Sequence, residues 1–192
     1  SFLLIFSDDS AHEAAMATTT FFQLLDLNPW REEKLEEEKF MAMVQADPTI
    51  VKRKYQFDAF GDDWVFPLHQ ICALGATAHC VKACFKGYPG ALEHDETKLG
   101  HPLHYACLFG ASLEVVRYLA KKDPNVLEIS NSEHRTPLHL ACMSQADADV
   151  VIFLTERCPQ AASKVDIDGC TPLHLACKVE QPILAVIEDL TE

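Results

Sequence analysis

The chain of 192 residues is 48% hydrophobic and 23% charged, which fits a folded globular protein and excludes an intrinsically disordered one. Its 29 acidic and 16 basic residues give a formal net charge of −13, which disfavours nucleic acid and favours a neutral or basic protein partner. The basic cluster Lys52-Arg53-Lys54 is too short to indicate a phosphate-binding site.

The N-terminal residues do not resemble a targeting segment. The apolar run SFLLIF at residues 1–6 is followed by Asp8 and Asp9, so it is too short to span a membrane and lacks the basic leader of a signal peptide. We therefore predict that residues 1–17 form a disordered N-terminal extension and that the protein does not associate with membranes.

Residues 18–60 contain helix-start and helix-stop signals in the order expected of a helix pair. Asn28-Pro29 is a helix-start signal, and the acidic residues between positions 32 and 38 favour the N-terminal end of a helix. Asp47-Pro48 would stop that helix. The apolar residues of the pair would be Phe21, Phe22, Leu24 and Leu25 in a short first helix, then Phe40, Met43 and Val44. We predict a degenerate capping repeat, because the end units of an array need a polar outer face.

A segment that begins with Pro-Leu-His recurs four times at a constant offset of 35 residues. The copies are PLHQICALGA at 67–76, PLHYACLFGA at 102–111, PLHLACMSQA at 137–146 and PLHLACKVEQ at 172–181. Another proline stands 13 residues before each of the last three copies, whereas Pro48 stands 19 residues before the first. The agreement indicates an internal repeat, with a first loop six residues longer than the others.

Each unit is predicted to consist of an inner helix, an outer helix and a loop. Proline suits the first position of a helix, so the inner helix begins at each Pro-Leu-His. Thr136 and Thr171 can cap two of these helices, while Gly75 and Gly110 suit a left-handed helix end. The outer helix follows, with apolar residues at helical spacing, as at positions 115–119. Because one unit cannot bury its apolar face alone, we expect the units to stack.

The sequence Thr-Pro-Leu-His-Leu-Ala at 136–141 and again at 171–176 resembles the signature of ankyrin repeats. The resemblance covers residues 62–192 and implies an all-α fold, an ankyrin-type solenoid of helix-turn-helix repeats with loop and β-turn connections. It implies about four repeats of 35 residues after the degenerate N-terminal cap, against about 33 residues in the family. The array would occupy residues 61–192, with units at about 62–97, 98–132, 133–167 and 168–192.

A few positions depart from the ankyrin pattern. Phe66 and His101 stand where the family has threonine, and Gln145 and Glu180 replace the glycine that ends the inner helix. We expect these substitutions to change the geometry of individual loops and to leave the fold intact.

Histidine and cysteine recur three residues apart in the inner helices, at His69/Cys72, His104/Cys107, His139/Cys142 and His174/Cys177. Zinc needs four ligands at about 2.0–2.3 Å, whereas stacked helices lie roughly 8–10 Å apart and each unit offers only two ligands. A catalytic pair would need a third, orienting group, and four equal copies indicate architecture instead. We predict no metal, cofactor or catalytic residue, and the resemblance implies that the histidine orients the loop by hydrogen bonding.

The other four cysteines fall into two groups according to their place in the repeat. Cys80 and Cys84 lie on the apolar face of an outer helix and are expected to pack there. Cys158 and Cys170 lie near a loop and are the better candidates for an exposed, oxidisable thiol, although packing is the interpretation we favour for them as well. A chain with this apolar content does not need disulfides, so we expect reduced thiols and an intracellular location, cytoplasmic or nuclear.

The resemblance implies a concave binding surface made of the loop tips and the exposed side of the inner helices. The candidate partner-binding residues are Trp64, Tyr105, Leu108, Phe109, Glu133, Arg135, Met143, Asp168 and Lys178. We predict a monomeric, non-catalytic protein–protein interaction module that acts as a scaffold or adaptor. The alternatives are a metal- or redox-responsive regulatory repeat protein and a regulatory fragment of a larger signalling protein.

Overall fold

The computed structural model of the chain describes residues 9–31, 33–94, 97–179 and 190. The α-helices of these residues are α1 (Asp9–Leu25), α2 (Glu37–Ala46), α3 (Pro67–Ala73), α4 (Ala78–Gly87), α5 (Pro102–Leu108), α6 (Leu113–Lys122), α7 (Pro137–Met143), α8 (Ala148–Arg157) and α9 (Pro172–Lys178). Short 3-10 helices are η1 (Pro29–Arg31), η2 (Ile50–Lys52), η3 (Asp58–Phe60), η4 (Pro89–Glu93), η5 (Pro124–Leu127) and η6 (Pro159–Ser163). None of the helices in these ranges is long and apolar enough to cross a bilayer.

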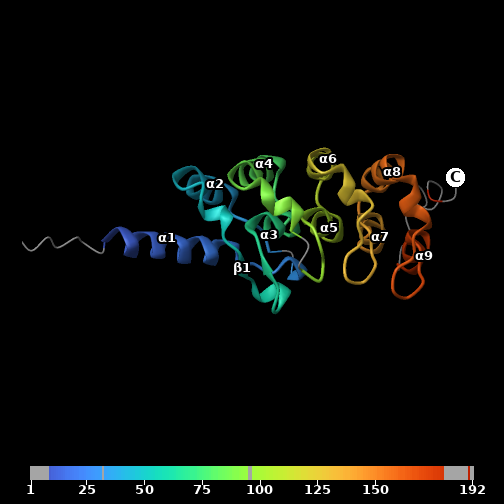
Figure 1. The fold of residues 1–192 in the computed structure, drawn as a ribbon, viewed down its shortest axis with the longest axis horizontal. Helices are drawn as coiled ribbons and strands as arrows, with labels where there is room; N and C mark the ends of the chain where they lie inside the picture. The colour runs from blue at the N-terminus through green and yellow to red at the C-terminus, as the bar shows by residue number, and fades with distance from the viewer. Residues whose placement is uncertain (1–8, 32, 95–96, 180–189, 191–192) are drawn as a thin grey trace, which may run out of the picture.

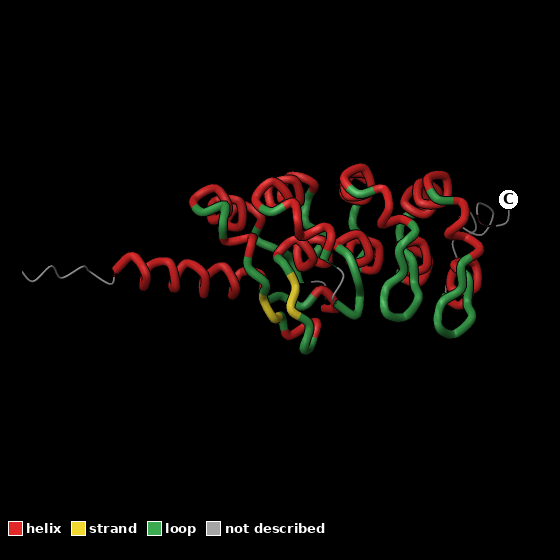
Figure 2. Tube along the Cα trace, in the orientation of Figure 1, coloured by secondary structure: helices red, strands yellow, loops and turns green. Residues whose placement is uncertain are grey.

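The helices form two rows (Figure 1). The inner helices α3, α5, α7 and α9 lie side by side, each packed against the next, and the outer helices α2, α4, α6 and α8 form the second row. The loops that lead into the inner helices project beyond them on the side away from the outer row (Figure 2). We call the loops at residues 97–101, 130–136 and 165–171 the fingers. The chain therefore has one edge made of fingers and an opposite edge made of outer helices.

The predicted starts of the inner helices are confirmed. All four begin at the proline of a Pro-Leu-His segment, because proline has the backbone angle of a first helical residue and lacks a donor that would find no partner there. Thr136 and Thr171 accept hydrogen bonds from the backbone N–H groups of His139 and His174, each at 3.4 Å. These bonds satisfy donors that the first helical turn leaves open.

The inner helices α3, α5 and α7 end in a left-handed residue whether or not it is glycine, and Glu180, at the corresponding place after α9, lies outside the described residues. Gly75 and Gly110 have φ angles of 65° and 68°, and Gln145 takes the same conformation at 56°. Left-handed backbone costs a residue with a Cβ roughly 1–2 kcal/mol, so the surrounding packing holds Gln145 there. After it, Ala146 N–H donates to Ala141 O at 3.0 Å, as Ala111 N–H donates to Ala106 O at 2.9 Å. The loss of glycine therefore leaves this helix end unchanged.

The core runs continuously between the two rows of helices. The leucines of the first three Pro-Leu-His segments and the apolar residues of the outer helices are buried, including Val115, Val116, Leu119, Val150, Val151 and Leu154. The apolar spacing therefore identified the buried face of the outer helices correctly. The predicted outer helix of the last unit lies outside the described residues except for Leu190.

The N-terminal cap differs from the sequence predictions in two respects. Disorder was wrongly predicted for residues 9–17, which form the first part of α1, while residues 1–8 lie outside the description. Pro29 begins only the single turn η1, and α2 does not start until Glu37. Pro29 is buried and the neighbouring Trp30 packs on Phe109, 4.6 Å between ring centroids. This contact with α5 interrupts the helix that the local sequence favours.

The long first loop contains a small β-hairpin, so the described chain is not entirely helical. Strand β1 (Tyr55–Gln56) pairs antiparallel with β2 (Trp64–Val65). Between the strands, Phe60 is buried, and Phe57 stacks on Phe22 of α1 at 5.6 Å. The six extra residues of this loop thus supply aromatic side chains that join the cap to the repeats.

Candidate functional site

The fingers are tied to one another by hydrogen bonds. Asp63, in the hairpin, accepts from Lys98 N–H at 2.9 Å, and Lys98 O accepts from the Ser132 hydroxyl at 2.8 Å. Glu133 O then accepts from Ile167 N–H at 3.0 Å. Each bond joins one finger to the next, so the tips form a continuous edge with fixed spacing.

Two of the fingers are shaped by a buried polar residue at their base. The Asn131 side-chain oxygen accepts from the N–H groups of Glu133 and Arg135, both at 3.0 Å. Asp166 does the same for Asp168 and Cys170, at 3.0 and 2.8 Å. Burial by itself would raise the pKa of Asp166, but hydrogen bonds from Cys170 and Arg135 bring this pKa below its ordinary value. Asp166 is therefore an ionised carboxylate that organises its turn.

Arg135, in the finger at residues 130–136, joins this finger to the finger at residues 165–171. Its guanidinium lies 2.5 Å from Glu133 in its own finger, and 3.2 and 3.6 Å from Asp166 and Asp168 in the neighbouring one. Its side chain is only 16% exposed. The structure thus brings together Glu133, Arg135 and Asp168, which were predicted to bind a partner, but Arg135 serves mainly to position the three carboxylates beside it.

Replacing Arg135 by glutamine should loosen this pair of fingers. Asp166 would lose its charged partner, and we expect the free energy of unfolding to fall by about 1.5–3 kcal/mol, the range for hydrogen bonds to charged groups. Urea denaturation would measure the loss, and hydrogen exchange should become faster at the Ile167 amide. Arg31→Gln, at an exposed arginine, is the matched control and should change stability by less than about 0.5 kcal/mol. Equal effects of both substitutions would contradict the role of Arg135.

The joined fingers expose two aliphatic side chains. Val165 and Ile167 are 52% and 64% exposed, and they flank the buried Asp166 in the sequence. Glu133 and Asp168, both exposed, lie in the same pair of fingers. We call Glu133, Val165, Ile167 and Asp168 the finger patch. Sequence reasoning did not select the two aliphatic residues, although apolar residues at a turn between repeats are a usable signal.

Two residues predicted to be exposed on the inner helices are buried instead. Tyr105 is 0% exposed, and Leu108 is also buried. The Tyr105 ring packs edge-on against Phe60 at 5.0 Å, and its hydroxyl donates to Thr97 Oγ1 at 3.1 Å. The predicted exposure of both residues was wrong, and in the case of Tyr105 it is Phe60 of the long first loop that covers the ring.

The other predicted contacts keep some access to solvent. Trp64 is exposed on β2, Met143 is half-buried at the end of α7, and Lys178 is exposed, with its ammonium donating to the Cys170 sulfur at 2.9 Å. Phe109 is half-buried beneath the exposed ring of Trp30. Trp30 was not selected from the sequence, since no local pattern links residues so far apart.

The repeated histidines use both ring nitrogens to hold the loops. Nδ1 of His104 and of His139 accepts the backbone N–H three residues earlier, at 3.2 Å in each case. Their Nε2 atoms lie 3.1 and 3.2 Å from the carbonyl oxygens of Ile129 and Cys170. The role in loop orientation is confirmed for these two. Burial lowers the pKa of His104 to about 4 and that of His69 to about 3, so both rings are neutral at pH 7.

The cysteines of the inner helices belong to the core, apart from the last. Cys72, Cys107 and Cys142 are buried, and burial raises the pKa of Cys72 and of Cys107 above the ordinary thiol value. Cys158 and Cys170 are also buried, as the favoured packing interpretation predicted, so the alternative of an exposed thiol at these two positions was wrong, and Cys177 is the exposed one. Within the described ranges, no group of three or more His, Cys, Asp or Glu side chains is arranged to hold a metal ion.

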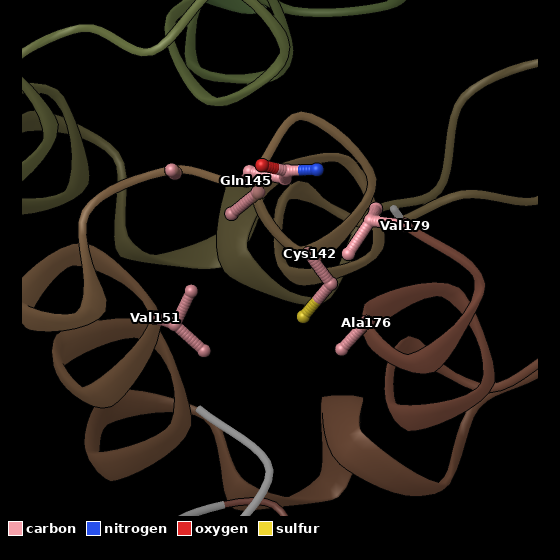
Figure 3. Close-up of a pocket in the computed structure, with 7 residues that line it drawn as sticks. Cys142, Gln145, Val151, Ala176 and Val179 are labelled. Atoms are coloured by element: carbon pink, nitrogen blue, oxygen red, sulfur yellow. The ribbon is translucent and has the colours of Figure 1, made fainter. Parts of the chain in front are cut away.

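A small apolar pocket lies where α7, α8 and α9 meet (Figure 3). Cys142, Val151 and Ala176 face a common space there, with Gln145 and Val179 at its edge. Its volume of about 10 Å³ is close to the minimum for one water molecule, far below the roughly 300 Å³ of a small ligand site. The pocket is therefore a packing gap between units.

Comparison with known proteins identifies the middle of the chain. Residues 103–155, from α5 into α8, match the family model described as ankyrin repeats (many copies). A search of curated proteins gave no significant match.

Proposed function

We propose that the chain, whose residues 103–155 match the family model of ankyrin repeats, is an ankyrin-repeat protein and a non-catalytic protein–protein interaction module that acts as a scaffold or adaptor. Ankyrin repeats are generally modules of this kind, and stacked repeats offer extended surfaces. We further propose a monomeric solenoid of about four 35-residue units after the cap at residues 18–60, located in the cytoplasm or nucleus. The constant 35-residue offset of the inner helices supports that repeat count.

The finger patch carries this proposal. It combines two exposed aliphatic side chains with carboxylates in fingers that are held by Arg135 and by the bond from Ile167 N–H to Glu133 O. A preorganised surface loses little conformational entropy on binding, which favours affinity. Aliphatic groups beside carboxylates suit a partner with an apolar contact and a neighbouring lysine or arginine.

The chemistry of the repeats argues against an enzyme. The buried histidines are engaged by backbone groups, and the raised pKa of Cys72 and of Cys107 keeps these thiols protonated at neutral pH. A nucleophile needs the opposite shift and a base within reach. These facts also weigh against a metal- or redox-responsive role for the inner-helix residues.

Substitution of Ile167 by serine should weaken partner binding about ten-fold or more, because an apolar contact at the centre of an interface is worth over 1.4 kcal/mol. We would crosslink the wild type and the variant in a native lysate and quantify the captured proteins by mass spectrometry. A purified captured partner would then give the dissociation constants.

The matched control is Ile129→Ser, which removes the same side chain from a groove lined by Pro89 and Lys122, away from the finger patch. Ile129→Ser should leave capture unchanged, and both variants should keep the wild-type circular dichroism spectrum. If Ile167→Ser captures the same partners as the wild type, the finger patch is not the binding surface.

A further inference from the structure

Three of the four outer helices, α4, α6 and α8, together carry charge of the opposite sign to the rest of the chain. Together α4, α6 and α8 have six basic and three acidic residues, a net charge of +3, in a chain whose net charge is −13. The remainder therefore carries −16. These helices lie side by side in the outer row, on the edge opposite the fingers (Figure 1). The three fingers, in contrast, contain two basic and three acidic residues, a net charge of −1.

A groove runs between α6, η5 and α8. Its volume is about 860 Å³, and its apolar lining comes from Ala120, Pro124, Leu127 and Phe153. The charged and polar groups along it are Arg117, Lys121, Asn125, Glu128, Glu156 and Arg157. The volume is within the range of ligand sites, and the mixture of aliphatic surface and cations is suited to a peptide.

Two arginines of the groove are fixed on one aromatic ring. The guanidinium carbons of Arg117 and Arg157 lie 5.3 and 5.7 Å from the centroid of the Phe153 ring. The ring is buried, so it is a rigid platform, and cation–π attraction holds both guanidinium groups against it. Among the described residues, no ion pair engages either arginine. Their N–H donors are therefore oriented and, among the described residues, bind no carboxylate.

We propose that this groove binds an acidic peptide segment of another protein, with Arg117 and Arg157 gripping its carboxylates. The guanidinium fork matches a carboxylate with two parallel hydrogen bonds. Because the phenyl platform already restricts both side chains, little rotamer entropy remains to be lost. An aliphatic side chain of the peptide contacts Ala120 and Leu127, while Glu128 and Glu156 repel carboxylates that are placed elsewhere in the groove. The proposal is independent of the finger patch, which lies on the other edge.

The charge pattern favours a short peptide over a nucleic acid. A nucleic acid would extend beyond the groove, and the net charge of −16 on the rest of the chain would repel its continuous row of phosphates. A short acidic segment needs only the few cations of the groove. The proposal therefore distinguishes two kinds of anionic ligand.

Fluorescence anisotropy with a short labelled peptide of glutamate and leucine tests the proposal at low salt. The wild type should bind the peptide. The double variant Arg117→Gln/Arg157→Gln should bind it with an affinity that is lower by about ten-fold or more, since charge-assisted hydrogen bonds are lost. The matched control is Lys39→Gln/Lys86→Gln, which removes the same charge at exposed lysines of α2 and α4. It should change the affinity less than about two-fold, because distant charges are screened.

Three results would overturn the proposal: no binding of the peptide by the wild type, equal loss in both double variants, or tighter binding of a labelled single-stranded oligonucleotide of equal length. Thermal melts of all variants by circular dichroism verify that each is folded. A change at the finger patch, such as Ile167→Ser, should leave peptide binding at this groove unaltered.

Discussion

Truncation of Tyr105 to alanine should lower the free energy of unfolding by about 3–5 kcal/mol, the usual cost of removing a fully buried aromatic side chain. The ring fills the space between Phe60 and His69, at centroid distances of 5.0 and 5.2 Å. Urea denaturation followed by circular dichroism would measure the loss.

Tyr105→Phe separates the two contributions of this side chain. It keeps the ring and removes only the hydrogen bond to Thr97 Oγ1, so we expect a loss of about 1 kcal/mol. Trp64→Ala, at an exposed aromatic residue, should change stability by less than about 0.5 kcal/mol. If Tyr105→Ala were as stable as Trp64→Ala, the burial of Tyr105 in the folded protein would be refuted.

Acidification from pH 7.5 to 5.5 should destabilise the protein by about 3 kcal/mol through His69 and His104 alone. In the folded state the pKa of these buried rings is about 3 and about 4, against about 6.5 in an unfolded chain. The unfolded state therefore binds more protons throughout this interval, and stability falls as the pH falls. The full contribution is present above pH 6.5 and is lost progressively down to the folded-state values.

The local geometry gives the reason for the shift at His104. Burial disfavours the charged ring. In addition, Nδ1 of His104 now accepts a hydrogen bond from the His101 N–H at 3.2 Å, and a proton on Nδ1 would place two N–H donors opposite each other. Glu37 and Asp166 have lowered pKa values in the folded state, so their stabilisation is present above the unfolded carboxyl pKa of about 4 and is lost only below it. They contribute little within the interval tested.

Urea unfolding at several pH values would measure the predicted slope, and nuclear magnetic resonance would identify the residues. The ring protons of His69 and His104 should not titrate between pH 7.5 and 5.5 in the folded protein. Titration of either ring with a midpoint near 6.5 would show that the ring is not held neutral by burial.

Part of the candidate site could be predicted from the sequence, and the errors have a common cause. Glu133 and Asp168 were assigned correctly to exposed finger tips because those residues follow the period of the repeat. Tyr105 and Leu108 were wrongly expected to be exposed, and the ring that covers Tyr105, Phe60, belongs to a loop far away in the sequence. The reason is that the burial of a residue depends on its neighbours in space. A periodic pattern predicts only those neighbours that belong to adjacent units.

The platform of Phe153 beneath Arg117 and Arg157 shows the same limit. Each residue fits an amphipathic helix taken alone, and the apolar spacing places Phe153 near the buried face of α8. The groove arises only when α6 and α8 come together, since its cations come from two units. No single repeat contains it.

The sequence alone determined that the inner helices start at proline, that an outer helix follows each of the first three and that the inner helices pack side by side, because these depend on local backbone preferences and on one repeated apolar face. The tertiary structure alone decided which surfaces remain open. The long first loop and the cap cover α5 with Phe60 and Trp30, while the finger patch stays exposed. Which surface is buried therefore depends on contacts between residues that are distant in the chain, and a local sequence pattern does not predict such contacts.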